Sequence, residues 1–310
     1  MRWAIFFDIS ALVVYYFLSP SVGGIEKNIS WFVVVFLWAL TIASGTRGTW
    51  MAMAVVMGCA FFMGAMGRKW FFLQFLGSLS GMLLYKVFVW GISSMGFEVL
   101  HLAGDRISAT MSSRGVLWGQ AILMMQKKPI LGFGPMHFAN IPNSYAAHPH
   151  QSLLQWVSEW GVPSAILMAM MVIFSIYSMV KHSKILIKEN DPNAPLYFCL
   201  STALFSSLVQ SQVDGVFVIP YTQFWIVLIL GWLISVHFQT VGGKNNQSKY
   251  FKIHVFWIHG ILFAVVLMLF SVFIYEAPRT YAGYNLLLES GMKRYEPRFW
   301  LHGVIGQSGK

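Results

Sequence analysis

Two histidines lie close together in the stretch His148-Pro149-His150-Gln151. No cysteine, carboxylate or third histidine stands at ligand spacing beside them, so we do not expect a metal site. We expect a helix to begin near Pro149, with His150 in its first turn, where the helix dipole disfavours the imidazolium form. A neutral imidazole can accept a proton from a hydroxyl. The pattern therefore predicts that His150 is a general base, with His148 and Gln151 as supporting residues.

Two arginines stand in similar short motifs, at residues 45–48 (Gly-Thr-Arg-Gly) and 112–115 (Ser-Ser-Arg-Gly). A guanidinium group presents forked donors that match the paired oxygens of a phosphate. Arg114 is expected in the first turn of a helix, where free backbone N–H groups also favour an anion. The structural alternatives are an interfacial anchor for Arg47 and a solvated loop residue for Arg114. We interpret the two arginines as candidate ligands of a diphosphate.

A third motif, Gly132-Phe133-Gly134-Pro135, resembles a nucleotide-binding loop only superficially. A dinucleotide fingerprint needs a preceding strand and a third glycine, and both are missing. We expect a tight turn in which Gly132 and Gly134 support the site. Arg279, at the start of the tail, is a further candidate, and Asp214, after an apolar run, is a weaker one.

The composition excludes a soluble globular or disordered chain. Of the 310 residues, 57% are hydrophobic and 10% are charged, whereas soluble domains carry about 25% charged residues. The net charge of +10 is better explained by basic loops next to lipid head groups than by nucleic acid, because no basic stripe with interleaved aromatics is present. Cys59 and Cys199 lie inside apolar runs and predict neither a disulfide framework nor a metal site.

The hydropathy pattern predicts an all-α protein, a polytopic bundle of about eight transmembrane helices with an outer-face loop of amphipathic helices. The first run follows Met1-Arg2 without a small-residue cleavage pattern and is expected to be a retained span. Ser112 and Ser113 are expected to cap a loop helix that ends before Pro129. Apolar runs fall at about 3–19, 30–45, 49–66, 71–95, 164–180, 195–213, 221–238 and 255–275.

Four parts of the chain follow from these runs. Lysine-bearing loops at 67–70, 181–194 and 239–254 are expected on the cytoplasmic side, which places the long loop and the tail on the outer side. The parts are N-terminal transmembrane helices (1–95), an outer, periplasmic catalytic loop (96–163), C-terminal transmembrane helices (164–275) and a periplasmic tail (276–310).

Over about residues 40–235 these motifs resemble the O-antigen ligase / O-antigen polymerase superfamily of bacterial inner membranes. The ligase signature is a histidine, then Asn, Ser or Gln, nine residues, a glycine, two residues and a second glycine. Here His150 and Gln151 are followed by nine residues and Gly161, but Ser164 stands at the last position. The segment 296–303 resembles tails of the protein-glycosylating branch.

The resemblance implies a metal-independent glycosyltransferase without cofactor, in the bacterial inner membrane, with its active site facing the periplasm. The implied donor is a glycan on undecaprenyl diphosphate, bound among membrane lipids. The implied acceptor is the lipid A–core glycolipid in a ligase, another repeat unit in a polymerase, or a serine or threonine in a protein O-oligosaccharyltransferase. In this reading Arg47 and Arg114 hold the diphosphate while His150 takes the acceptor proton. A lipid or solute transporter, and an assembly factor without chemistry, remain alternatives from other classes.

Overall fold

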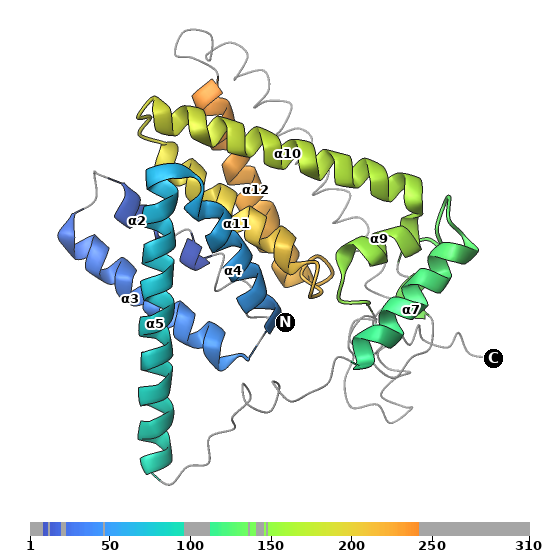
Figure 1. The fold of residues 1–310 in the computed structure, drawn as a ribbon, viewed down its shortest axis with the longest axis horizontal. Helices are drawn as coiled ribbons and strands as arrows, with labels where there is room; N and C mark the ends of the chain where they lie inside the picture. The colour runs from blue at the N-terminus through green and yellow to red at the C-terminus, as the bar shows by residue number, and fades with distance from the viewer. Residues whose placement is uncertain are drawn as a thin grey trace, which may run out of the picture.

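A computed structural model describes residues 9–11, 13–19, 23–45, 47–95, 112–135, 137–140, 146 and 148–241. Every regular element in these ranges is a helix (Figure 1), which confirms the predicted all-α class for this part of the chain. The expected span at 255–275 and the tail with Arg279 lie outside the described residues. The helices are α2 (Tyr15–Leu18), α3 (Gly24–Ala43), α4 (Arg47–Phe61), α5 (Gly64–Ser94), α7 (Ser112–Lys127), α8 (His137–Asn140), α9 (Ser152–Trp160), α10 (Val162–Lys188), α11 (Ala194–Gln210) and α12 (Pro220–Val241).

Four of the described helices are long and apolar enough to cross a membrane: α3, α5, α10 and α12. Two shorter apolar helices, α4 and α11, pack among them. The described residues thus support a polytopic membrane protein with four candidate spans, rather than the full set of about eight that the sequence predicts.

The basic residues of two expected cytoplasmic loops lie in helices instead. Arg68 and Lys69 lie inside α5, because the chain reverses earlier, at Phe62–Met63, and Gly64 begins α5 with a φ of 87°. α10 continues to Lys188, so the lysines at positions 181, 184 and 188 lie on its last turns. Lysine and arginine are good helix formers whose long stems can cover apolar surface, and a charge alone does not end a helix.

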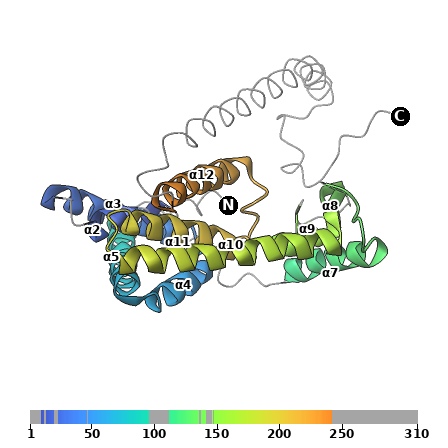
Figure 2. The same ribbon diagram turned by 90° about the horizontal axis from the view of Figure 1, so that it is seen from above.

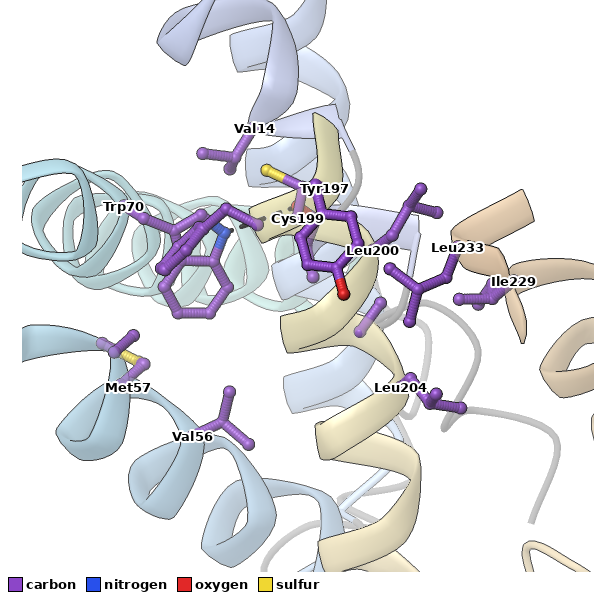
Figure 3. Close-up of a cluster of buried hydrophobic side chains, with 14 of the residues drawn as sticks. Val14, Val56, Met57, Trp70, Tyr197, Cys199, Leu200, Leu204, Ile229 and Leu233 are labelled. Atoms are coloured by element: carbon purple, nitrogen blue, oxygen red, sulfur yellow. Dashed lines mark hydrogen bonds between the residues drawn. The ribbon is translucent and has the colours of Figure 1, made fainter. Parts of the chain in front are cut away.

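The core is built around α11, whose side chains are buried along most of its length. Figure 3 shows Tyr197, Cys199, Leu200 and Leu204 of this helix facing side chains of α4, α5 and α12. Trp70 of α5 packs edge-on against Phe198, with ring centroids 6.4 Å apart. The labelled neighbours from α4 and α12 are Val56, Met57, Ile229 and Leu233.

α3 and α5 pack closely because α5 places glycines at the crossing. A Cβ atom on Gly81 would lie 2.5 Å from Cβ of Trp38, and one on Gly77 would lie 2.7 Å from Val34. Trp38 Nε1 donates to Oε1 of the buried Gln74 at 2.8 Å. Small residues that admit a neighbouring backbone are typical of helix contacts in membranes.

α10 is held mainly at its two ends. Its buried residues are Ala165 near the start and Ser183 and Leu186 near the end, while side chains such as Met171 and Phe174 between them are exposed. Figures 1 and 2 show α10 as a long helix. α7, α8 and α9 lie at its N-terminal end, away from α2, α3 and α5.

Candidate active site

The region around His150 differs from the predicted local structure. α9 begins at Ser152, with Gln151 as its N-cap, and the Gln151 side chain accepts a hydrogen bond from the backbone N–H of Leu154. His150 therefore precedes the helix, with a left-handed φ of 55°, and the prediction that it lies in the first helical turn is wrong. A left-handed non-glycine residue is uncommon, although histidine adopts this region more often than most residues. The turn at His150 directs the chain into α9.

The start of α9 is fastened to the end of α11. The backbone N–H of Ser152 donates to Ser211 O at 3.0 Å, and its hydroxyl lies 2.9 Å from both Ser211 O and Ser211 Oγ. Gln212 Nε2 donates to Ser152 Oγ at 3.1 Å. These bonds use a carbonyl group that the end of α11 leaves without a helical partner. They bring His150 next to the turn that follows α11.

Asp214, in that turn, pairs with His150. The Oδ1 atom of Asp214 lies 3.4 Å from Nδ1 of His150 and accepts the backbone N–H of Gly215 at 2.8 Å. Burial acts to raise the pKa of the Asp214 carboxyl, but the hydrogen bonds from His150 and Gly215 outweigh it and leave the pKa below its usual value. A carboxylate facing Nδ1 keeps the proton on that nitrogen. The lone pair of the neutral ring is then on Nε2, as a general base requires.

His148 packs against the ring of His150. The two ring centroids are 4.2 Å apart, and both ring nitrogens of His148 are buried with no hydrogen-bond partner among the described residues. Burial, reinforced by the charge of His150 and opposed by Asp214, lowers the pKa of His148 to about 4. A Cβ atom on Gly215 would lie 2.2 Å from His148 Nε2. The neutral ring of His148 thus fills the space between His150 and the Gly215 backbone.

The structure places the start of α4 beside the same turn. Arg47 is the first residue of α4, and a Cβ atom on Gly48 would lie 3.0 Å from a methyl group of Val213. Thr49 Oγ1 accepts a hydrogen bond of 2.8 Å from Gln210 Nε2. The backbone of Arg47 is therefore one residue from the contact with Val213, and Val213 directly precedes Asp214.

Arg114 is brought near His150 by a different helix, α7. It lies in the first turn of α7, as predicted, one turn before Trp118, whose Nε1 donates to Pro149 O at 3.0 Å. Residues four apart lie on one face of a helix, so Arg114 stands one turn from a direct contact beside His150. Within the described part of the chain no carboxylate forms a salt bridge with Arg114.

The predicted tight turn at 132–135 is confirmed, with φ of 67° at Gly132 and 98° at Gly134. A Cβ atom on Gly132 would lie 2.4 Å from the backbone of Glu159. The N–H groups of Phe133 and Gly134 donate to Ser158 O and Glu159 O at 3.1 and 2.8 Å. This turn fixes the segment after α7 to the end of α9, so its glycines support the site through the backbone rather than by contact with His150.

An apolar groove lies next to the start of α9. It has a volume of about 660 Å³ and is lined by side chains from α9, α10, α11 and α12. Its polar lining includes Ser152 and Gln212, which are hydrogen-bonded to each other and lie two residues from His150 and Asp214, respectively. An apolar groove with a few polar groups in its lining fits an amphiphile with a long hydrocarbon chain.

The opposite end of α11 carries a second polar cluster that sequence reasoning did not identify. His182 of α10 contacts His237 of α12, with ring centroids 4.4 Å apart, and Tyr197 of α11 contacts both rings. His182 Nε2 lies 2.6 Å from Thr240 Oγ1, and the Tyr197 hydroxyl lies 3.1 Å from His237 Nδ1. Here α10 and α12 meet beyond the groove. Across the described residues no three His, Cys, Asp or Glu side chains gather as a metal-ligand set.

Apolar helices of membrane-spanning length and a polar site at one end of the bundle define a multi-pass membrane protein. Comparison with known families narrows this class: residues 32–184 match the O-antigen ligase family. This part of the chain, from within α3 to within α10, matches the family that the motifs predicted. No curated protein and no solved structure in the comparison matches the chain.

The matched region includes Arg47, Arg114 and His150 but ends before Asp214. The sequence indicated Asp214 only as a weak candidate, and it gave no sign of the bonds between Ser152 and Ser211. The available signal for Asp214 was an acidic residue directly after an apolar run. Its pairing with a residue 64 positions away becomes visible only in the fold.

Proposed function

We propose that the protein is a glycosyltransferase that moves a glycan from a lipid-linked diphosphate donor to an acceptor hydroxyl, with the lipid A–core glycolipid as acceptor. The observation that carries the proposal is the 3.4 Å pair of His150 and Asp214, each two residues along the chain from a polar residue that lines the apolar groove, in a chain whose residues 32–184 match the O-antigen ligase family. In the proposed arrangement the site faces the periplasm from the bacterial inner membrane.

His150 acts as the base in this reaction. Its Nε2 atom takes the proton of the acceptor hydroxyl while the hydroxyl oxygen attacks the anomeric carbon of the donor sugar. The bond from that carbon to the diphosphate oxygen breaks, and the lipid diphosphate leaves with the electron pair. Asp214 keeps the imidazole in the required tautomer and stabilises the imidazolium that forms.

The two arginines stabilise the leaving group. The departing diphosphate gains negative charge next to low-dielectric lipid, where fixed cationic donors are most effective. Arg47 begins a helix beside the Asp214 turn, and Arg114 lies in the first turn of α7 near Pro149. Each can meet the diphosphate together with the free N–H groups of a helix start.

The groove holds the start of the donor's polyprenyl chain, proposed to be undecaprenyl. Its lining is mostly apolar, and its polar residues include Ser152 and Gln212, which lie two residues from His150 and Asp214, respectively. A chain lying in the groove would place the diphosphate beside the base. This supports a donor with a long hydrocarbon anchor over a soluble nucleotide sugar.

The decisive experiment is transfer in a bacterial strain that lacks its own ligase. The parent chain, His150→Ala and His137→Ala are produced at matched membrane abundance, and lipopolysaccharide is separated and stained. His137 is an exposed histidine of α8 and serves as the matched control. We expect ladders with the parent and the control, and none with His150→Ala.

Ladders that survive His150→Ala would contradict the assignment of the base. No ladder from any variant, with the protein present, would contradict the lipid A–core acceptor. Assays for glycan on protein and for polymerised repeat units would then test the two other acceptors of the superfamily. Binding of the lipid diphosphate without any transfer would instead favour a transporter.

A further inference from the structure

The turn after α7 exposes two adjacent aliphatic side chains. Ile130 is 69% exposed and Leu131 is 83% exposed, and both belong to a short projecting segment, residues 127–131, which we call the tip. A single exposed leucine needs no explanation. Two neighbouring ones at the end of a projecting turn indicate a surface that contacts something apolar.

The depth of the tip follows from its contacts with α10. The backbone N–H of Val162, the first residue of α10, donates to Pro129 O at 2.8 Å, and a Cβ atom on Gly161 would lie 2.1 Å from Ile130 O. From Val162 to Val180 the helix carries no charged residue, a length of about 28 Å at 1.5 Å per residue. This matches the roughly 30 Å hydrocarbon core of a bilayer. The boundary of the hydrocarbon therefore falls at Val162, and the tip lies at that boundary.

The charged side chains of the tip itself are two lysines. Lys127 and Lys128 are exposed, and the Nζ atom of Lys128 also lies 4.8 Å from the centre of the Phe133 ring. The described segment 112–135 contains Arg114 as well, and no aspartate or glutamate. Lysines beside apolar side chains at the membrane boundary complement the phosphates of anionic lipid head groups.

We propose that the tip is a lipid anchor: Ile130 and Leu131 enter the leaflet that surrounds the start of α10, and Lys127 and Lys128 bind the phosphates of its anionic phospholipids. The anchor holds α7 at a fixed height over the bilayer. Because Trp118 of α7 is bonded to Pro149, it also sets the height of Arg114 and His150. The inference concerns the lipid surface and does not depend on the proposed reaction.

The test is a depth measurement by spin labelling in lipid nanodiscs. A label is placed at Leu131→Cys in a Cys59→Ser background, since Cys199 is fully buried. The matched control is Lys188→Cys, at the C-terminal end of α10, whose N-terminal end contacts the tip. Oxygen concentrates in the hydrocarbon, whereas a nickel chelate stays in water. We expect the label at position 131 to collide mainly with oxygen and the label at position 188 mainly with the nickel chelate.

Equal access of the nickel chelate to both labels would overturn the proposal, because the tip would then lie in water. A label at position 131 that is shielded from both reagents would also overturn it, because another protein surface would then cover the tip. The lysines are tested by adding phosphatidylglycerol to phosphatidylcholine nanodiscs. We expect the anionic lipid to draw the label deeper in the parent and not in the Lys127→Gln/Lys128→Gln variant, and no response in the parent would contradict their role.

Discussion

His150 Nδ1 lies 3.4 Å from Asp214 Oδ1, although 64 positions separate the two residues along the chain. Each residue is held by a different element, His150 by the turn before α9 and Asp214 by the turn after α11. The bonds between Ser152 and Ser211 join these elements. The pair is therefore a product of how α9 docks on α11, and its geometry can be tested through either partner.

The Asp214→Asn substitution should slow transfer by about one to two orders of magnitude. A neutral amide no longer keeps the proton on Nδ1 or stabilises the imidazolium, whereas loss of the base itself costs about 10²–10⁴-fold. Initial rates at matched abundance measure the effect. Asp191→Asn, at the turn between α10 and α11, is the control, and equal rates for both variants would contradict a role for Asp214.

Arg114→Lys and Arg47→Lys should each reduce transfer at least about tenfold while leaving protein abundance unchanged. Lysine keeps the charge but loses the planar fork that grips two phosphate oxygens. The matched control is Arg68→Lys, on exposed surface of α5. Near-parental rates for both site variants would count against a diphosphate clamp.

Stability should fall as the pH drops from about 6.5 to about 4. The pKa of His148 is about 4 in the folded protein and about 6.5 when unfolded. Between these values the unfolded chain binds a proton that the folded one excludes, so the free energy of unfolding decreases by up to about 3 kcal/mol and then levels off. Thermal unfolding in nanodiscs across this range measures the change.

His148→Phe keeps a ring of similar size and removes the titration. We expect its unfolding midpoint to vary less between pH 6.5 and 4 than that of the parent. The lowered pKa of Asp214 contributes in a different window, since its stabilisation is lost only when the pH falls below the usual aspartate value of about 3.9. An unchanged pH response in His148→Phe would contradict the assignment to His148.

Filling the groove should weaken the use of long-chain donors. Val172→Trp on α10 places a bulky ring in the cavity, and we expect a KM several-fold higher for a long polyprenyl donor and a smaller change for a short-chain analogue. Phe174→Trp, on the same helix but pointing to the exposed side, is the control. An equal effect on both donors would indicate general damage rather than competition for the groove.

The sequence predicts the helices well because apolar length and helix boundaries are local properties. The loop helix with Arg114 could be located from the serines before it and Pro129 after it, and the structure has it at Ser112–Lys127. The start of α9 could not, because the Gln151 side chain caps the helix and His150 turns left-handed before it. Proline at position 149 suggested an earlier start.

The site was predictable only as a set of residue types. His150, Arg47 and Arg114 could be named from their motifs, but a single sequence carries no distances. The pairing of Asp214 with His150, and the close approach of His148 to Gly215, depend on the docking of α9 onto α11. Both involve contacts between segments that are far apart in the chain.

The weak burial of α10 between its ends has a consequence for how a long substrate could arrive. The middle of the helix borders the groove on one side and is exposed on the other. A hydrocarbon tail would then need no threading through a closed tunnel, because it could slide in from the plane of the bilayer. The part of the tail that is longer than the groove would stay among the lipids. After transfer, the lipid diphosphate would leave by diffusing sideways into the bilayer.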